Sequence, residues 1–189
     1  MSGSNGSETP VAIRPMTAAD APAVMAFARA LPEHDLLFLP RDITHPKVLD
    51  AWVAELERGT LTSLVAVSGE RVVGNATIVC DKLSWSPHVA ELRVVVSADA
   101  RGRGVGRRLM ERAFALAVPL GIEKLIAQMT VDQTAAIKTF ESMGYRAEAL
   151  LRDHVKDRSG TKYDLVILSH DVAEFAARAA AYGRMDADG

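Results

Sequence analysis

The stretch that most restricts the fold of this chain is a glycine- and arginine-rich run at residues 101–108, Arg-Gly-Arg-Gly-Val-Gly-Arg-Arg. An apolar, strand-like segment at 89–96 precedes it, and apolar residues recur at helical spacing from 105 to 116. The run therefore lies where a strand gives way to a helix, whose first backbone N–H groups are unpaired. Glycines let an anion approach these groups, and the arginines add positive charge. The sequence predicts a phosphate or pyrophosphate site here.

The spacing of the glycines excludes two common nucleotide-binding loops. A P-loop ends in Gly-Lys followed by Ser or Thr, and no such residues follow the run. A dinucleotide fingerprint needs a third glycine, but the frames starting at Gly102 and Gly104 have Arg107 and Leu109 there. A tight turn with a solvated arginine face stays open as the alternative interpretation.

Composition excludes several further classes of protein. The 189 residues are 49% hydrophobic and 24% charged, with a formal net charge of −2, which fits one soluble domain. That charge argues against a nucleic-acid partner held by bulk positive charge. The single cysteine, Cys80, excludes an internal disulfide and a cysteine-based zinc site, and the five histidines show no metal-ligand spacing. With no apolar run of membrane length and no signal-peptide core, we expect a cytoplasmic protein without a membrane partner.

The chain divides into one domain and three terminal segments. We expect disorder at 1–9, a single domain at 10–170, an appended alanine-rich helix at 171–184 and a disordered tail at 185–189. Strands are predicted at 11–14, 61–67, 72–80, 89–96, 125–131, 146–155 and 162–169, and helices at 21–30, 45–58, 105–116 and 134–143. This order is mixed α/β without the regular alternation of a doubly wound sheet.

Three segments resemble one known family. Arg101, Gly104 and Gly106 match the pattern [QR]-x-x-G-x-[GA]; Ile-Arg-Pro at 13–15 precedes Thr-Ala-Ala-Asp at 17–20; and an Ala-Ile pair at 136–137 leads to Met-Gly-Tyr at 143–145. In these segments and in element order, residues 11–169 resemble the GNAT superfamily of acetyl-CoA-dependent N-acetyltransferases. The resemblance implies an α/β (α+β) fold with a mixed, mostly antiparallel sheet, splayed between the strands at 89–96 and 125–131, and flanking helices.

The resemblance also implies the reaction and the cosubstrate. An acetyl group would pass from acetyl-CoA, without a metal, to a primary amine by direct attack in a ternary complex; the acceptor could be a protein lysine or a small amine. Three valines would line the pantetheine arm through backbone hydrogen bonds, and residues 101–107 would hold the pyrophosphate. The implied cofactor-binding residues are Val94, Val95, Val96, Arg101, Gly102, Arg103, Gly104, Val105, Gly106, Arg107, Gln133 and Phe140.

Two residues are implied as catalytic. The Val94 N–H would polarise the thioester carbonyl, and Glu91 would act as general base. A structural or substrate-contact role for Glu91 stays open, because a shift of one residue in register reverses the face that a side chain takes. Arg93 alternates with Glu91 and could pair with it.

The general acid is where the chain departs from the family. Phe140 stands where many members carry a tyrosine that protonates the leaving thiolate, and Tyr145 occupies a packing position. Because a free thiol has a pKa near ~8.5, the thiolate can leave to solvent without a dedicated acid.

An acidic segment precedes the second helix. Glu33 and Asp35 lie where substrates of the family enter, and they are predicted to bind a cationic amine, with ordinary loop charges as the alternative. The alternative for the whole protein is a catalytically impaired acyl-CoA-binding sensor or interaction module, which Phe140 alone supports. Because dimers are common in the family, the resemblance also implies a homodimer, with the C-terminal helix packing on its own sheet or on a second subunit.

Overall fold

The computed structural model describes residues 10–172 and has the predicted order of elements. The strands are β1 (Val11–Pro15), β2 (Leu61–Ser68), β3 (Arg71–Val79), β4 (Val89–Val96), β5 (Lys124–Thr130), β6 (Arg146–Lys156) and β7 (Lys162–Asp171). The helices are α1 (Ala21–Ala30), α2 (Pro46–Glu57), α3 (Val105–Ala117) and α4 (Thr134–Ser142), with short 3₁₀ turns η1 (Ala18–Asp20), η2 (Glu33–Leu36) and η3 (Ala98–Ala100).

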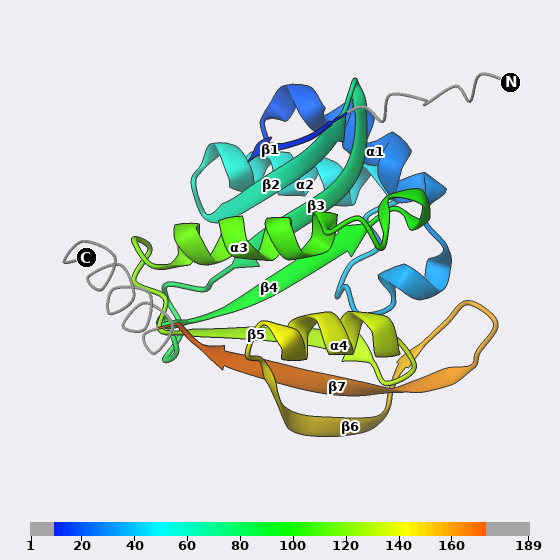
Figure 1. Cartoon of the computed structure of the whole chain (residues 1–189), viewed down its shortest axis with the longest axis vertical. Helices are drawn as coiled ribbons and strands as arrows, with labels where there is room; N and C mark the ends of the chain where they lie inside the picture. The colour runs from blue at the N-terminus through cyan, green and yellow to red at the C-terminus, as the bar shows by residue number, and fades with distance from the viewer. Residues whose placement is uncertain (1–9, 173–189) are drawn as a thin grey trace, which may run out of the picture.

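The seven strands form one sheet in the order β1-β2-β3-β4-β5-β7-β6. Every neighbouring pair is antiparallel except β4 and β5, which run parallel and pair over only three residues, 89–91 with 124–126. Beyond Glu91 the two strands separate, as Figure 1 shows. The predicted mixed sheet with a splay between these two strands is therefore confirmed.

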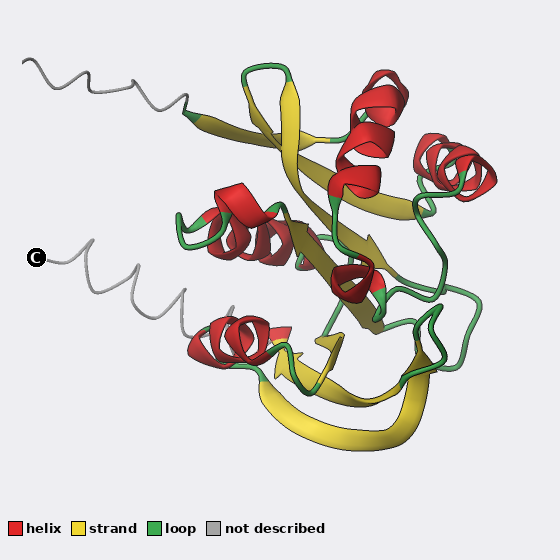
Figure 2. Ribbon diagram, turned by 90° about the vertical axis from the view of Figure 1, so that its right-hand side faces the viewer, coloured by secondary structure: helices red, strands yellow, loops and turns green. Residues whose placement is uncertain are grey.

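Helices cover both faces of the sheet (Figure 2). α3 and α4 lie on the face turned to the viewer in Figure 1, and α1 and α2 lie behind it. Each face has its own core: Leu109, Phe114 and Leu125 are buried on the α3 side, and Phe27, Leu49 and Val65 on the α1 side. Alternation along β4 divides its side chains between the two, because Leu92 belongs to the first core and Val95 to the second.

Local chemistry accounts for the main boundaries. Thr17 and Asp20 form a capping box, in which the Asp20 carboxylate accepts hydrogen bonds from the Thr17 N–H at 2.8 Å and from the Thr17 hydroxyl at 3.0 Å. Gly59 ends α2 with a φ of 68°, a left-handed value that glycine adopts without strain. The last strand continues to Asp171, where we expected the appended helix to begin.

Some of the predictions lie outside the described residues. These are the disordered start at 1–9, the tail at 185–189 and nearly all of the helix at 171–184. Within residues 10–172, no helix is both long enough and apolar enough to cross a bilayer.

Candidate functional site

The separation of β4 from β5 opens a cavity of about 720 Å³, which we name the β4–β5 cleft. Its walls come from β4, the turn before α3, the end of β5, α4 and η2. Eleven of the twelve implied cofactor-binding residues line it: Val94, Val95, Val96, Arg101, Gly102, Gly104, Val105, Gly106, Arg107, Gln133 and Phe140. Arg103 is not among the lining residues. A site made from four separate segments of the sequence is thus brought together by the fold.

Backbone direction along β4 follows from its pairing with β3. The Ser97 N–H donates to the Val73 carbonyl, so alternate residues of β4 turn their backbone groups toward β3. Val95 shares this direction, so its backbone groups turn toward β3 and not into the cleft, where we expected them. Val94 and Val96 turn the other way, into the opening, where Arg101 Nε donates to the Val96 carbonyl at 3.2 Å.

The glycine–arginine turn presents free backbone groups to the cleft. Gly102 and Gly104 have φ values of 71° and 74°, and a Cβ at either position would meet nothing within 4 Å. The first backbone hydrogen bond of α3 runs from the Arg108 N–H to the Gly104 carbonyl, so the preceding N–H groups of the helix lack an intrahelical acceptor. Together with the arginines, these groups form a corner whose chemistry suits an anion, which we name the anion-binding corner.

Arg101 forms an ion pair that the sequence did not indicate. Its Nη2 lies 2.5 Å from Asp35 Oδ2, and Asp35 belongs to η2, far away in the sequence. The structure thus places Asp35 in the wall of the cleft, facing the arginine of the anion-binding corner. Its charge is offset there by Arg101, so an incoming cationic amine would have to compete with that arginine.

His34 of η2 contacts the wall of the cleft that follows β5, opposite Arg101. Its Nε2 lies 2.8 Å from Asp132 Oδ2, and its ring packs 5.1 Å from that of Tyr163, centroid to centroid. Gln133 Nε2 donates to the His34 carbonyl at 3.3 Å. The segment between α1 and α2 therefore bridges the two lips of the cleft, a role of His34 that no local pattern signals.

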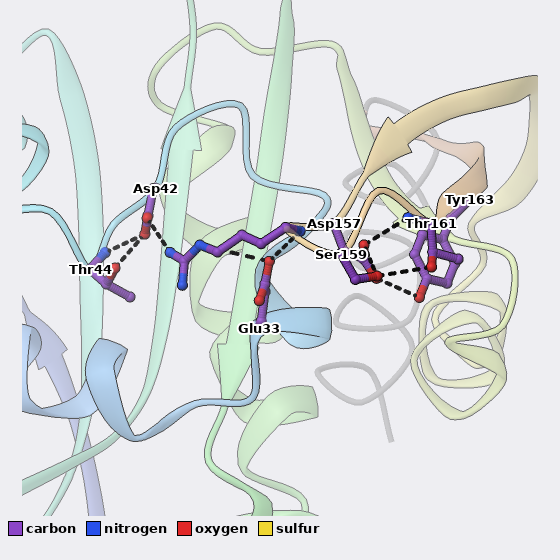
Figure 3. Close-up of polar contacts among 8 residues, drawn as sticks. Glu33, Asp42, Thr44, Asp157, Ser159, Thr161 and Tyr163 are labelled. Atoms are coloured by element: carbon purple, nitrogen blue, oxygen red, sulfur yellow. Dashed lines mark hydrogen bonds and ion pairs between the residues drawn. The ribbon is translucent and has the colours of Figure 1, made fainter.

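The other predicted acceptor-binding carboxylate, Glu33, also has an arginine partner. Figure 3 shows Glu33 and Asp42 on the same side of the β6–β7 turn residues Asp157, Ser159 and Thr161. The backbone N–H of Arg158 donates to Glu33 Oε1 at 2.9 Å, and the Nη2 of the Arg158 side chain donates to Asp42 Oδ2 at 2.7 Å. The Thr44 hydroxyl, and to a lesser degree Arg158, lower the pKa of Asp42. Arg101 offsets Asp35, whereas Glu33 and Asp42 share the single charge of Arg158, so cations from the same chain neutralise the acidic lip only in part.

A second cavity of about 500 Å³ lies on the opposite face of the sheet, beneath α1 and α2. We name it the α1–α2 pocket. It is lined by Val24, Phe27, Leu39, Pro40, Arg41, Ile43, Val48, Trp52, Glu55, Leu61, Asn75, Thr77, Val79, Asp81, Arg93 and Val95. Val95 lines both cavities, so they adjoin at β4. No local sequence pattern signals this pocket, because none of the segments that line it carries a motif.

Glu91 and Arg93 form the pair that their alternation indicated. Arg93 Nη2 lies 2.6 Å from Glu91 Oε2, and their side chains are only 22% and 14% exposed respectively. Glu91 is the last residue of β4 paired with β5, at the apex of the opening. Both side chains share the face of Val95, toward α1 and α2. Arg93 lines the α1–α2 pocket, and Glu91, which lines neither cavity, is held beside it at the end of the β4–β5 pairing.

Phe140 and Tyr145 pack as an aromatic pair, with ring centroids 4.9 Å apart. Tyr145 is 2% exposed, and burial raises its pKa, so it retains its proton. Its hydroxyl has no hydrogen-bond partner among the described residues. Tyr145 does not line the β4–β5 cleft, which agrees with the packing role expected from sequence.

Other reactive side chains do not assemble into a centre. Within residues 10–172, no group of three or more His, Cys, Asp or Glu side chains is arranged to hold a metal ion. Cys80 is partly buried, and its Sγ donates to the Pro87 carbonyl at 3.2 Å.

Comparison with known proteins agrees with this geometry. The sequence model of the acetyltransferase (GNAT) family matches residues 26–145. The chain is 33% identical over 84 residues to the putative phosphinothricin acetyltransferase YwnH of Bacillus subtilis, a match that covers 44% of this chain and 51% of that protein. The chain therefore spans about half the length of this curated relative.

Two solved structures illustrate the likeness in fold. The ribosomal-protein-alanine N-acetyltransferase from Brucella melitensis aligns with a TM-score of 0.70 at 25% identity, covering 85% of this chain and 99% of that one. YncA, a putative acetyltransferase from Salmonella typhimurium solved with acetyl-CoA, aligns with a TM-score of 0.73 at 21% identity, covering 86% and 94%.

Proposed function

Because the chain belongs to the acetyltransferase (GNAT) family, we propose that it transfers an acetyl group from acetyl-CoA to an amine by direct attack in a ternary complex. The observation that carries this proposal is the opening of the sheet beyond Glu91, directly beside the glycine–arginine turn. One cavity then offers an anion-binding corner at one end and unpaired strand backbone along its length.

The lining residues fit acetyl-CoA. The N–H groups at the start of α3, with Arg101 and Arg107, supply donors and positive charge for a pyrophosphate. The backbone groups of Val94 and Val96 and the amide of Gln133 would hydrogen-bond the pantetheine arm, while Phe140 would pack against it. Because Asp35 already neutralises Arg101, cofactor binding would replace that carboxylate with the pyrophosphate.

The reacting end of the cofactor would lie near the apex of the cleft. There the amine nitrogen bonds to the acetyl carbon, the carbon–sulfur bond breaks, and the sulfur leaves as thiolate. The N–H of Val94, directed into the opening, would stabilise the charge that develops on the acetyl oxygen. Phe140 has no proton to give, so the thiolate takes its proton from solvent.

Glu91 would remove the amine proton. An alkyl amine with a pKa near ~10.4 is neutral in only about one molecule in a few thousand at pH 7, so a base accelerates attack. Glu91 Oε2 is engaged by Arg93, while Glu91 Oε1 is buried and has no partner among the described residues, which leaves it available to accept that proton.

The test is a calorimetric titration of the purified chain with acetyl-CoA, free CoA and ATP, followed by a thiol-release assay with amines. We expect micromolar binding of both CoA species, no heat with ATP, and thiol release only when an amine is present. No binding of either CoA species would contradict the proposal.

Phe140 in place of tyrosine favours the alternative of an acyl-CoA-binding sensor. Binding of acetyl-CoA without turnover of any amine would support that alternative, and turnover would exclude it. The homodimer and the cytoplasmic location stay predictions from the sequence. A species of twice the chain mass in analytical ultracentrifugation would support the dimer.

A further inference from the structure

The α1–α2 pocket combines an apolar wall with a small set of charged groups. Phe27, Leu39, Ile43 and Trp52 supply aromatic and aliphatic surface from α1, the following segment and α2. Arg93 reaches the pocket from β4, on the face it shares with Glu91. Small-molecule sites commonly have this composition, in which apolar surface binds the body of the ligand and a few polar groups fix its orientation.

Three buried polar atoms in and beside this pocket lack a hydrogen-bond partner among residues 10–172. Two are donors, Trp52 Nε1 and Arg93 Nε, and the third is the acceptor Glu91 Oε1. Buried polar groups in folded proteins are almost always paired, because leaving one unpaired costs about 1–3 kcal/mol. The unpaired donors of Trp52 and Arg93 in the pocket wall therefore indicate that a ligand would supply an acceptor, and Glu91 Oε1, beside the wall through its pair with Arg93, indicates a donor.

The remaining polar groups of the pocket floor do not need a ligand. Asn75 Nδ2 donates to Ser63 Oγ and to the Leu64 carbonyl, both at 2.9 Å. The Thr77 hydroxyl donates to Asn75 Oδ1 at 3.0 Å. This buried network is satisfied by its own members, so the unmet hydrogen-bonding capacity is concentrated at Trp52, Arg93 and Glu91.

From this arrangement we infer that the acceptor is a free α-amino acid with an apolar side chain. Its carboxylate would accept hydrogen bonds from Arg93 Nε and the Trp52 N–H, and its side chain would lie against Phe27 and Leu39. Its ammonium group, one carbon from the carboxylate, would then face Glu91 Oε1 at the apex of the β4–β5 cleft. The Arg93–Glu91 pair, with charges of opposite sign on one strand face, complements the two charges of an α-amino acid.

The same groups oppose other classes of amine. A polyamine or a lysine side chain would bring positive charge against Arg93 without supplying an acceptor for its Nε or for Trp52. The carboxylates that we expected to attract such a cation, Glu33 and Asp35, are paired with Arg158 and Arg101. Because Glu55 and Asp81 line the pocket together with Arg41 and Arg93, the discrimination rests on the unpaired donors Arg93 Nε and Trp52 Nε1, which a cationic acceptor would leave without a partner.

The inference rests on the proposed function and is tested by pairs of acceptors that differ only in the carboxylate. Leucine, methionine and phenylalanine are each compared with the amine left after decarboxylation, namely isoamylamine, 3-(methylthio)propylamine and phenethylamine. Thiol release is measured at saturating acetyl-CoA. We expect kcat/KM for at least one amino acid to exceed that of its decarboxylated partner about ten- to a hundredfold, the value of charge-assisted hydrogen bonds.

Two variants test the residues assigned to the carboxylate. Arg93→Gln should reduce the preference for the amino acid to about threefold or less, and Trp52→Phe, which keeps an aromatic ring, though a smaller one, but removes the N–H, should reduce it by a smaller factor. Arg29→Gln is the matched control, because Arg29 is an exposed arginine on α1; it should retain the full preference. Thermal melting checks that each variant is folded.

The outcomes separate this inference from the proposed function. If acetyl-CoA binds but the decarboxylated amines, spermidine or a lysine-containing peptide react as well as the amino acids, the inference is overturned and the acetyltransferase proposal stands. An unchanged preference in Arg93→Gln would also overturn it. If no CoA species binds, the proposed function fails first, and the assignment of the α1–α2 pocket to an acceptor fails with it.

Discussion

The two cavities that adjoin at β4 are built in different ways. The β4–β5 cleft owes its chemistry largely to backbone: a strand whose partner has separated, glycines with positive φ and the N–H groups at the start of a helix. The α1–α2 pocket owes its chemistry to side chains from α1, α2, the segment between them and three strands. A backbone site tolerates variation in side chains, whereas a side-chain site changes its ligand with each substitution. Under the proposed function, this difference explains how the same fold retains one cosubstrate while its acceptor varies.

The largest effect should follow a change at Glu91, where the pairing of β4 with β5 ends. Replacing Glu91 by Gln keeps the size and the hydrogen bond from Arg93 but removes the base, so we expect kcat/KM to fall about a hundred- to a thousandfold. The dissociation constant for acetyl-CoA should stay the same, because Glu91 does not line the cleft. Thiol-release kinetics and calorimetry measure the two quantities.

Glu57→Gln is the control for that change, since Glu57 is an exposed glutamate at the end of α2. It should leave both quantities unaltered. A loss of less than threefold in Glu91→Gln would show that the amine proton leaves through water, and that the pair of Glu91 with Arg93 serves binding alone.

A smaller effect, on the affinity for acetyl-CoA, should follow Gly104→Val, which tests recognition by backbone groups rather than by side chains. Gly104→Val puts a branched Cβ beside the anion-binding corner, at a φ of 74°, and we expect acetyl-CoA affinity to fall about thirty- to a hundredfold. Gly59→Val is the matched control, because Gly59 has a similar φ of 68° but ends α2, away from both cavities. Both variants should melt at similarly lowered temperatures. Equal loss of affinity in the two would mean that strain, not the corner, controls cofactor binding.

The sequence sufficed to predict what local pattern encodes. Periodicity predicted all seven strands and the four α-helices of the described region in order, and six of the seven residues of the predicted anion-binding turn at 101–107 line the β4–β5 cleft. That turn is readable because its chemistry lies in consecutive residues. The splay between β4 and β5 came from the family resemblance, since no residue of either strand signals that pairing stops after Glu91.

The sequence could not predict contacts between distant segments. Asp35 and Arg101 are 66 positions apart, and Arg158 lies 125 positions from Glu33. A carboxylate in an irregular segment looks the same in sequence whether it attracts a substrate or pairs with an arginine across the fold. The α1–α2 pocket could not be predicted for the same reason. Its residues Phe27, Trp52 and Arg93 come from separate elements, and each looks in sequence like an ordinary residue of an amphipathic helix or strand.

The smallest effect should follow Asp20→Asn, a change next to α1, which walls the α1–α2 pocket but not the β4–β5 cleft. The Asp20 carboxylate accepts hydrogen bonds from Arg14 at 2.7 and 2.8 Å and from Thr17, which hold its pKa well below the ordinary value. Because the pKa is lowered in the folded state, this stabilisation is present above about pH 4 and is lost as the pH falls below it. Asp20→Asn should therefore lower the free energy of unfolding by about 2 kcal/mol at pH 7, and by less at pH 3.

Asp20 precedes α1, which walls the α1–α2 pocket but not the β4–β5 cleft. The same variant should therefore raise the KM for the acceptor about two- to threefold, by loosening the start of α1, and leave acetyl-CoA affinity unchanged. Asp50→Asn, at an exposed position of α2, is the control for removal of one negative charge. If Asp20→Asn weakened acetyl-CoA binding as much as acceptor binding, the two cavities would have to be regarded as one coupled site, and the division between backbone and side-chain recognition would fail.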